Sequence, residues 1–224
     1  MTQQPFAIAR PAESILATNK LIRNTYTLLS MTLLFSAAMA GVSLAIGAPY
    51  IISIGCSIAA IVLIWFVIPR YRNSTAALPL TFLFTGLLGF GLGPTLSYYL
   101  TTFTNGAQLI LTAAGGTGVI FLGLSGYVLT SRKDFSFMGG FLFVGLLVAI
   151  LGMIGAIIFS IPSLFLAISA MMIIIMSGFI LFDTSRIIHG GETNYVMATI
   201  SLFLDIVILF QHLLNLLGVF SGED

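Results

Sequence analysis

Seven apolar runs, each close to the length that spans a bilayer, follow one another along this chain and limit what it can fold into. A helix needs about 20 apolar residues to cross the hydrocarbon core of a membrane. The connectors between the runs are short and contain the glycine and proline residues typical of turns. The runs cover residues 26–47, 50–68, 77–100, 107–130, 137–159, 163–182 and 196–220. The sequence therefore predicts an all-α membrane protein built as a bundle of seven transmembrane helices.

The small number of charged residues supports the same fold class. Of 224 residues, 58% are hydrophobic, eight are Lys or Arg, and seven are Asp or Glu. A soluble domain covers its surface with charged side chains, whereas residues 135–182 of this chain carry none. The formal net charge of +1 excludes a broad basic surface for nucleic acid. The lone Cys56 excludes a disulfide framework and a Cys/His metal site. The scarcity of charged residues makes the lipid bilayer the expected environment.

The positions of the basic residues predict how the bundle is oriented. All of them fall in the N-terminal tail or in the second, fourth and sixth connectors, and with seven spans these segments lie on one face. The positive-inside rule identifies that face as the cytoplasm. We expect a cytoplasmic tail over residues 1–23, a membrane domain over 24–220, and a short C-terminal tail over 221–224 outside. The basic residues are Arg10, Lys20, Arg23, Arg70, Arg72, Arg132, Lys133 and Arg186.

Two clusters of glycine lie inside the third and fourth apolar runs. The first contains Gly86, Gly89, Gly91 and Gly93, and the second lies at residues 115–118. The second has a GxG element, but no Lys-Ser/Thr pair follows it, so a nucleotide site is disfavoured. Small residues allow membrane helices to approach closely, and we expect both clusters to serve helix packing.

Two carboxylates at membrane depth are the candidate site. Asp205 lies about ten residues into the last apolar run, and Asp183 lies near the cytoplasmic end of the sixth, three residues before Arg186. A hairpin turn centred on Asn194 places both acids at one depth, and a turn centred on Glu192 separates their depths by about 6 Å. Two carboxylates in a low-dielectric site share a proton or bind a cation. The sequence therefore predicts a pH-sensitive cation or proton site, and a weak calcium site if further oxygen ligands are present.

Each acid also has a simpler interpretation. Asp205 could be a structural carboxylate whose oxygens are satisfied by a hydroxyl or an Arg. Asp183 could form a surface ion pair with Arg186. His212 shares a helix face with Asp205 and is a candidate partner, although no His-x-x-x-His spacing favours a metal site.

Motifs around these acids resemble the Bax inhibitor-1 family over nearly the whole chain. The most specific are Ile-Leu-Phe-Asp-Thr-Ser at 180–185, His-Gly-Gly-Glu-Thr-Asn-Tyr at 189–195 and Ser-Leu-Phe-Leu-Asp at 201–205. Further matching stretches are 21–26, 91–100 and 132–140. The resemblance implies a seven-helix bundle whose last helix is central.

Two functions are implied by this resemblance. Calcium-leak members of the family carry a di-aspartyl pH sensor, which maps onto Asp183 and Asp205, and an Arg that engages it, to which Arg70 or Arg72 corresponds. A bacterial branch instead modulates the FtsH protease, and the N-terminal tail is the segment expected to bind the protease. We therefore expect a non-enzymatic inner-membrane protein that modulates an FtsH-type protease and retains a pH-sensitive cation site, with no cofactor except calcium. The alternative is a pH-dependent calcium leak channel or a cation/proton transporter.

A third interpretation is an intramembrane aspartyl protease, because paired aspartates on adjacent spans are its catalytic requirement. The Gly-x-Gly that precedes the second Asp in such enzymes is absent here, and no Pro-Ala-Leu motif follows it. The sequence therefore disfavours this reaction.

Overall fold

The computed structural model describes residues 12–222, with side chains from Leu16 onward, and within this range it is helical without strands. Seven of its helices are long and apolar enough to cross a membrane, which confirms the predicted fold class. The second span is one helical rod in three parts: α2, a π-helical turn at Leu63–Val67, and α3. The fifth span begins with a 3₁₀ turn at Ser136–Met138, and the remaining spans are single α-helices. The bounds are α1 Ala12–Ala45, α2 Tyr50–Val62, α3 Ile68–Tyr71, α4 Ala77–Thr102, α5 Gly106–Ser131, α6 Gly139–Ile158, α7 Pro162–His189 and α8 Tyr195–Ser221.

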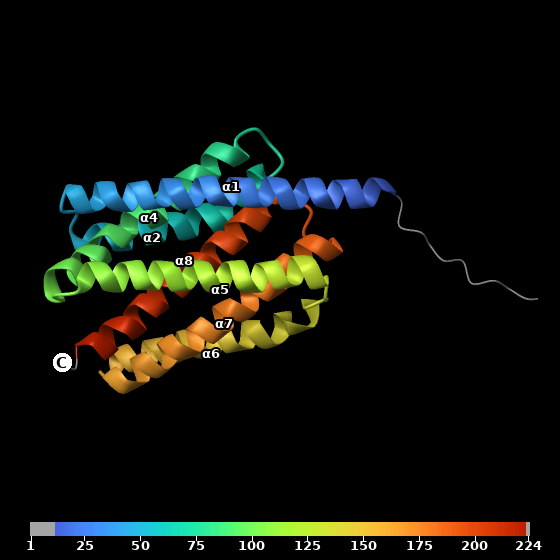
Figure 1. The fold of residues 1–224 in the computed structure, drawn as a ribbon. Coiled ribbons are helices and arrows are strands. Elements are labelled where there is room, and N and C mark those ends of the chain that lie inside the picture. Colours follow the sequence, from blue (N-terminus) through green and yellow to red (C-terminus); the bar gives the residue numbers. More distant parts are fainter. Residues whose placement is uncertain (1–11, 223–224) are drawn as a thin grey trace, which may run out of the picture.

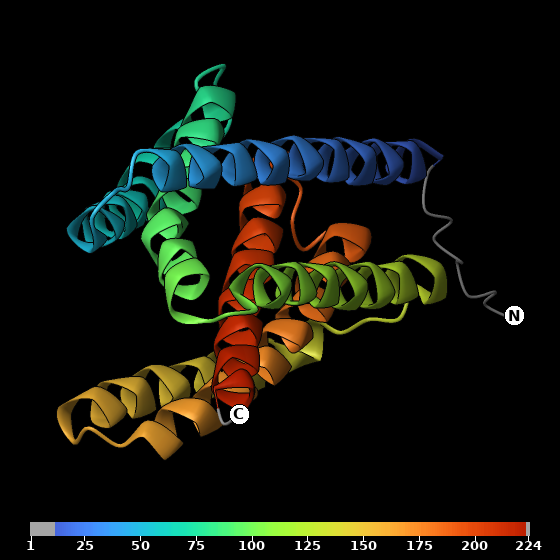
Figure 2. The same ribbon diagram turned by 60° about the vertical axis from the view of Figure 1, so that its left-hand side comes forward.

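Helix α8 occupies the centre of the bundle, as expected. It packs against α1, α4, α5 and α7, and Figure 2 shows it running between the first two and the last two. Leu202, Phe203 and Leu209 on α8 are fully buried. Helix α2 packs on α4, and α6 packs on α7, at the periphery (Figure 1). The last helix therefore carries its side chains into the most enclosed part of the molecule.

Three of the spans extend beyond the predicted runs by three residues or more. Helix α1 already begins at Ala12, so residues 12–23 of the expected tail are helical. The second span continues past Pro69, which lies just beyond the π-helical turn at Leu63–Val67 and has no N–H to donate to it. Helix α7 continues past residue 182 until Gly190, whose positive φ of 80° ends it. Asp183 is therefore held inside a helix, two turns before its end.

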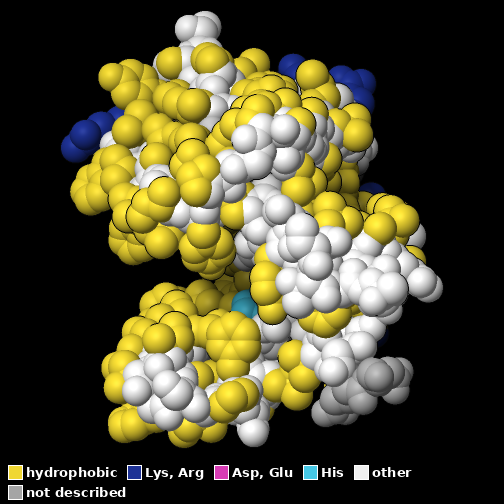
Figure 3. Space-filling view, turned by 90° about the vertical axis from the view of Figure 1, so that its left-hand side faces the viewer, with side chains coloured by type: hydrophobic (Ala, Val, Ile, Leu, Met, Phe, Trp, Pro, Cys, Tyr) yellow, Lys and Arg dark blue, Asp and Glu magenta, His cyan; other side chains and the backbone are white. Residues whose placement is uncertain are grey.

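The connectors that carry the basic residues lie at one end of the bundle, together with the described start of α1 (Figure 1). Figure 3 views the molecule from the opposite end. Hydrophobic and uncharged side chains dominate this view, Lys and Arg appear at its margins, and no described Asp or Glu is visible. This separation is the one from which the orientation was predicted, and the identity of each side of the membrane stays a prediction.

Candidate functional site

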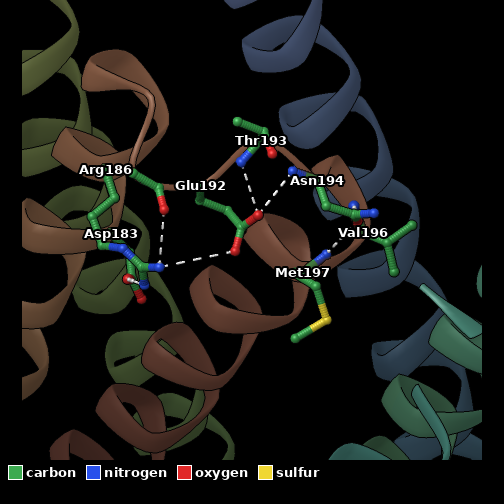
Figure 4. Close-up of polar contacts among 8 residues, drawn as sticks. Asp183, Arg186, Glu192, Thr193, Asn194, Val196 and Met197 are labelled. Carbon is green, nitrogen blue, oxygen red and sulfur yellow. Dashed lines mark hydrogen bonds and ion pairs between the residues drawn. The ribbon is translucent and has the colours of Figure 1, made fainter. Parts of the chain in front are cut away.

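The turn between α7 and α8 fixes the hairpin that carries both acids. Gly190 adopts a left-handed conformation that L-residues with a Cβ disfavour, and the chain reverses there. The backbone N–H groups of Gly191 and Glu192 then donate to the carbonyl of Arg186, at 2.9 and 3.2 Å. The N–H of Gly190 donates to the same carbonyl, so three consecutive N–H groups converge on it at the end of α7. The connector is residues 190–194, shown in Figure 4.

Asn194 begins α8 and joins the hairpin to a second connector. Its Oδ1 accepts from the backbone N–H groups of Val196 (2.9 Å) and Met197 (3.1 Å), which is an N-cap. Its Nδ2 donates to the carbonyl of Arg72 at 2.8 Å and to Oδ1 of Asn73 at 2.9 Å. One side chain therefore sets the start of α8 and the position of the hairpin against the α3–α4 turn.

Arg186 lies between two acids at the end of the hairpin (Figure 4). Its Nη1 is 3.5 Å from Oδ1 of Asp183, and its Nη2 is 4.0 Å from Oε2 of Glu192. The Arg186 side chain is 34% exposed, whereas that of Asp183 is 13% exposed. The other carboxylate oxygen of Glu192 accepts from the backbone N–H groups of Thr193 and Asn194, both at 2.8 Å. Asp183 therefore has a cation, but one that it shares and that faces water.

Asp205 is placed very differently. The residue is 6% exposed, and its Oδ2 is buried without a hydrogen-bond partner. Within residues 16–222, no Lys or Arg forms an ion pair with it. Burying an unpaired carboxylate costs several kcal/mol, so the charged form needs a cation and the uncharged form needs a proton.

Asp183 and Asp205 lie on the two helices of the hairpin, α7 and α8, which pack against each other. Asp183 lies six residues before the end of α7, and Asp205 lies ten residues after the start of α8. Such a pair can share a proton or hold one cation. In the described part of the chain, no cluster of three or more His, Cys, Asp or Glu could hold a metal ion. Calcium at this place would need backbone carbonyls or water as further ligands.

None of the other candidate partners forms an ion pair with either acid among the residues whose side chains are described. The side chains of Arg70 and Arg72 are exposed, and neither forms an ion pair with any residue whose side chain the structure describes. His212 Nδ1 is 3.3 Å from Oγ of Ser169, to which Asn215 Nδ2 also donates at 2.9 Å. The polar side chains of α8 beyond Asp205, those of His212 and Asn215, therefore contact α7. Arg186 is the one candidate for which a contact with an aspartate is observed among these residues.

A chain of hydrogen-bonded hydroxyl groups ends at Thr184, the residue after Asp183, and it was not predicted from the sequence. Tyr26 on α1 is hydrogen-bonded to Ser125 on α5, and Ser125 Oγ is 3.2 Å from Oγ1 of Thr184 on α7. Isolated hydroxyl residues in apolar runs are common, and their partners come from three different helices. No spacing within one helix could have identified this connection.

Comparison with known proteins identifies relatives of the whole chain. The sequence pattern of the family described as "Inhibitor of apoptosis-promoting Bax1" matches residues 18–222. An "Uncharacterized membrane protein" of Vibrio cholerae is 47% identical over 224 residues, which cover 100% of both chains. The "Modulator of FtsH protease YccA" of Escherichia coli K12 is 45% identical over 213 residues, which cover 94% of each chain. A protein of Escherichia coli O6:H1 with the same identity and coverage is named "Inner membrane protein YccA".

Proposed function

We propose that this chain, which belongs to the Bax inhibitor-1 family, modulates an FtsH-type protease of the inner membrane and holds a pH-sensitive proton or cation site between α7 and α8. It is an inner-membrane protein with seven spanning helices. It acts on proteolysis as a modulator and not as an enzyme. The observation that carries the first part is the 45% identity, over 94% of both chains, to a relative named as a modulator of this protease.

The protease binds the N-terminal segment, which we place in the cytoplasm together with the basic connectors. Residues 1–11 lie outside the described residues, and residues 12–23 form the first turns of α1. A partner that binds this segment would therefore be connected directly to a helix that packs on the central α8. Binding at this segment would therefore act on the helix bundle through α1.

The second part of the proposal rests on Asp205. Its buried Oδ2 without a partner, on a helix that packs against the helix carrying Asp183, is an arrangement that a proton or a cation would stabilise. The same observation favours the alternative function, a pH-dependent calcium leak or cation/proton transport. In both cases Asp183 and Asp205 are the ligands of the ion or proton, and Arg186 competes for Asp183.

Deletion of the segment tests the protease function. The full chain and variants lacking residues 2–11 or 2–20 are expressed, and the FtsH-type protease that co-purifies with each is measured. We expect the deletion of residues 2–20 to weaken association and to relieve inhibition of membrane-protein degradation. The deletion of residues 2–11 leaves α1 complete. It therefore separates loss of the protease-binding segment from damage to the helix.

The variant Asp205→Asn is the matched control, because it changes the acid pair and leaves the segment intact. It should retain the protease. If equal amounts of the protease co-purified with the full chain and with the variant lacking residues 2–20, the N-terminal segment would not be the protease-binding segment.

A further inference from the structure

A second cluster of titratable groups lies at the end of α7, outside the acid pair. The connector between α5 and α6 contacts Ser185 and His189 there. The backbone N–H of Phe135 donates to Oγ of Ser185 at 2.9 Å, and Oγ of Ser185 is 3.3 Å from Oδ1 of Asp134. His189 Nε2 is 3.1 Å from the carbonyl oxygen of Arg132. These contacts attach the connector to the helix that also carries Asp183.

Both ring nitrogens of His189 face carbonyl oxygens. Nδ1 is 2.9 Å from the carbonyl oxygen of Ser185, and Nε2 faces that of Arg132. A carbonyl oxygen can only accept, and a neutral imidazole has a single N–H, so one of the two contacts has no hydrogen in the neutral ring. The imidazolium has two N–H groups and satisfies both.

The neutral ring has another arrangement within reach. Nδ1 is also 3.3 Å from Oγ of Ser185, so a neutral ring that keeps its hydrogen on Nε2 can accept the hydroxyl hydrogen there. Ser185 has one such hydrogen, and Asp134 needs the same one to accept. The hydroxyl can therefore serve His189 or Asp134, but not both.

We propose that His189, Ser185 and Asp134 form a proton-binding site in which protonation of His189 turns the Ser185 hydroxyl from the histidine to Asp134. One proton from hydronium in the surrounding water binds Nδ1: an N–H bond forms, an O–H bond of the hydronium breaks and leaves water, and the connector between α5 and α6 gains a hydrogen bond to α7. The site goes beyond the proposed function and does not depend on Asp205.

One charged side chain, that of Asp134, contacts Ser185 directly. Asp134 is exposed, and its pKa is held below its ordinary value by hydrogen bonds from the backbone and side chain of Ser136, so it is negative near neutral pH. The carbonyl end of α7 also favours a cation.

The cations nearby are oriented to other partners. On the connector, Lys133 Nζ lies 5.7 Å from the ring centre of Tyr127, and Arg132 is exposed. On α7, Arg186 contacts Asp183 and Glu192. Asp134 is therefore the charge that faces the histidine through Ser185.

The ring nitrogens of His189 provide the direct test. The full chain in lipid nanodiscs, labelled with nitrogen-15 in its two histidines, is followed by NMR between about pH 5.5 and pH 8, around the usual range of histidine. The variant His189→Gln assigns the signals. We expect the neutral ring to carry its hydrogen on Nε2 alone, and Ser185→Ala to shift part of it to Nδ1. A neutral ring with its hydrogen on Nδ1, or a Ser185→Ala variant with the wild-type tautomer, would overturn the proposal.

Hydrogen exchange of the backbone N–H groups of Phe135 and Ser136 measures the attachment of the connector. After correction for the intrinsic effect of pH, protection should be about threefold or more higher at the lower pH, a factor within the net worth of one hydrogen bond. His189→Gln, which stays neutral, should abolish the difference, and Asp205→Asn should keep it. The same pH dependence in His189→Gln would exclude the histidine, and its loss in Asp205→Asn would show that the two sites are one.

Discussion

At the scale of single residues, the two acids of the hairpin differ in how their charge is compensated. Asp183 has Arg186 at 3.5 Å and lies near the end of its helix, whereas Oδ2 of Asp205 is buried without a partner. The interpretation of Asp183 as an ion pair with Arg186 therefore describes part of its environment. The corresponding structural interpretation of Asp205, with its oxygens satisfied by a hydroxyl or an Arg, is not met at Oδ2. Because of this difference, we expect a proton or a cation to have the larger effect at Asp205.

The first residue-scale prediction concerns the cap that holds the hairpin in place. Asn194→Ala removes two capping bonds to α8 and two bonds to the α3–α4 turn, and should lower the free energy of unfolding by about 1–2 kcal/mol. Unfolding in detergent with increasing denaturant measures it. Asn105→Ala is the control: Asn105 precedes α5 without capping it and its side chain donates one hydrogen bond, to Oγ of Ser221 at 2.7 Å, so the variant should change stability by less. Equal effects of the two variants would contradict the role assigned to Asn194.

At the scale of helices, close packing of α1 on α4 depends on glycine. A Cβ at Gly89 would overlap the backbone carbonyl of Ser36, and one at Gly93 would overlap the side chain of Ser43. This confirms the packing role predicted for the first glycine cluster. The same prediction was wrong for Gly115 and Gly118, where a Cβ would meet no atom within 4 Å. The sequence shows where small residues gather, but which helix approaches them depends on the assembled bundle.

Substitution at Gly89 tests this contact. Gly89→Ala should destabilise the protein by about 1–3 kcal/mol, because the backbone of Ser36 cannot move aside as a flexible side chain would. Gly115→Ala introduces the same methyl group into open space and should leave thermal stability unchanged or slightly raise it, since alanine favours helix. The melting temperatures of both variants in one detergent measure the difference. Similar values would refute close approach at Gly89.

At the scale of the whole molecule, the length of apolar runs predicted the seven spans because hydrocarbon demands a fixed helix length. Helix ends were less predictable, since a helix such as α7 continues beyond the apolar run until a residue like Gly190 stops it. Antiparallel connectivity was enough to place Asp183 and Asp205 on adjacent helices. The contacts of Tyr26 with Ser125 and of Ser125 with Thr184 join helices that are not consecutive in the chain, so local patterns could not supply them.

Accessibility of introduced cysteines tests the predicted orientation. In a background with Cys56→Ser, both Lys133→Cys and Asn105→Cys place a thiol at an exposed position, in connectors at opposite ends of the bundle. A membrane-impermeant thiol reagent added outside the inner membrane should label Asn105→Cys and spare Lys133→Cys until the membrane is opened. The reverse pattern would mean that the basic connectors lie outside.

The acid pair is tested most directly by ion flux into liposomes that contain the purified protein, compared for wild type and Asp205→Asn between about pH 5.5 and pH 8, where coupled carboxylates in a low-dielectric site can titrate. We predict that calcium or proton flux of the wild type depends on pH and that Asp205→Asn alters the flux or removes this dependence. Asp183→Asn should act in the same direction, since both carboxylates contribute to one site. Identical flux of wild type and Asp205→Asn at every pH would contradict a proton or cation site between α7 and α8.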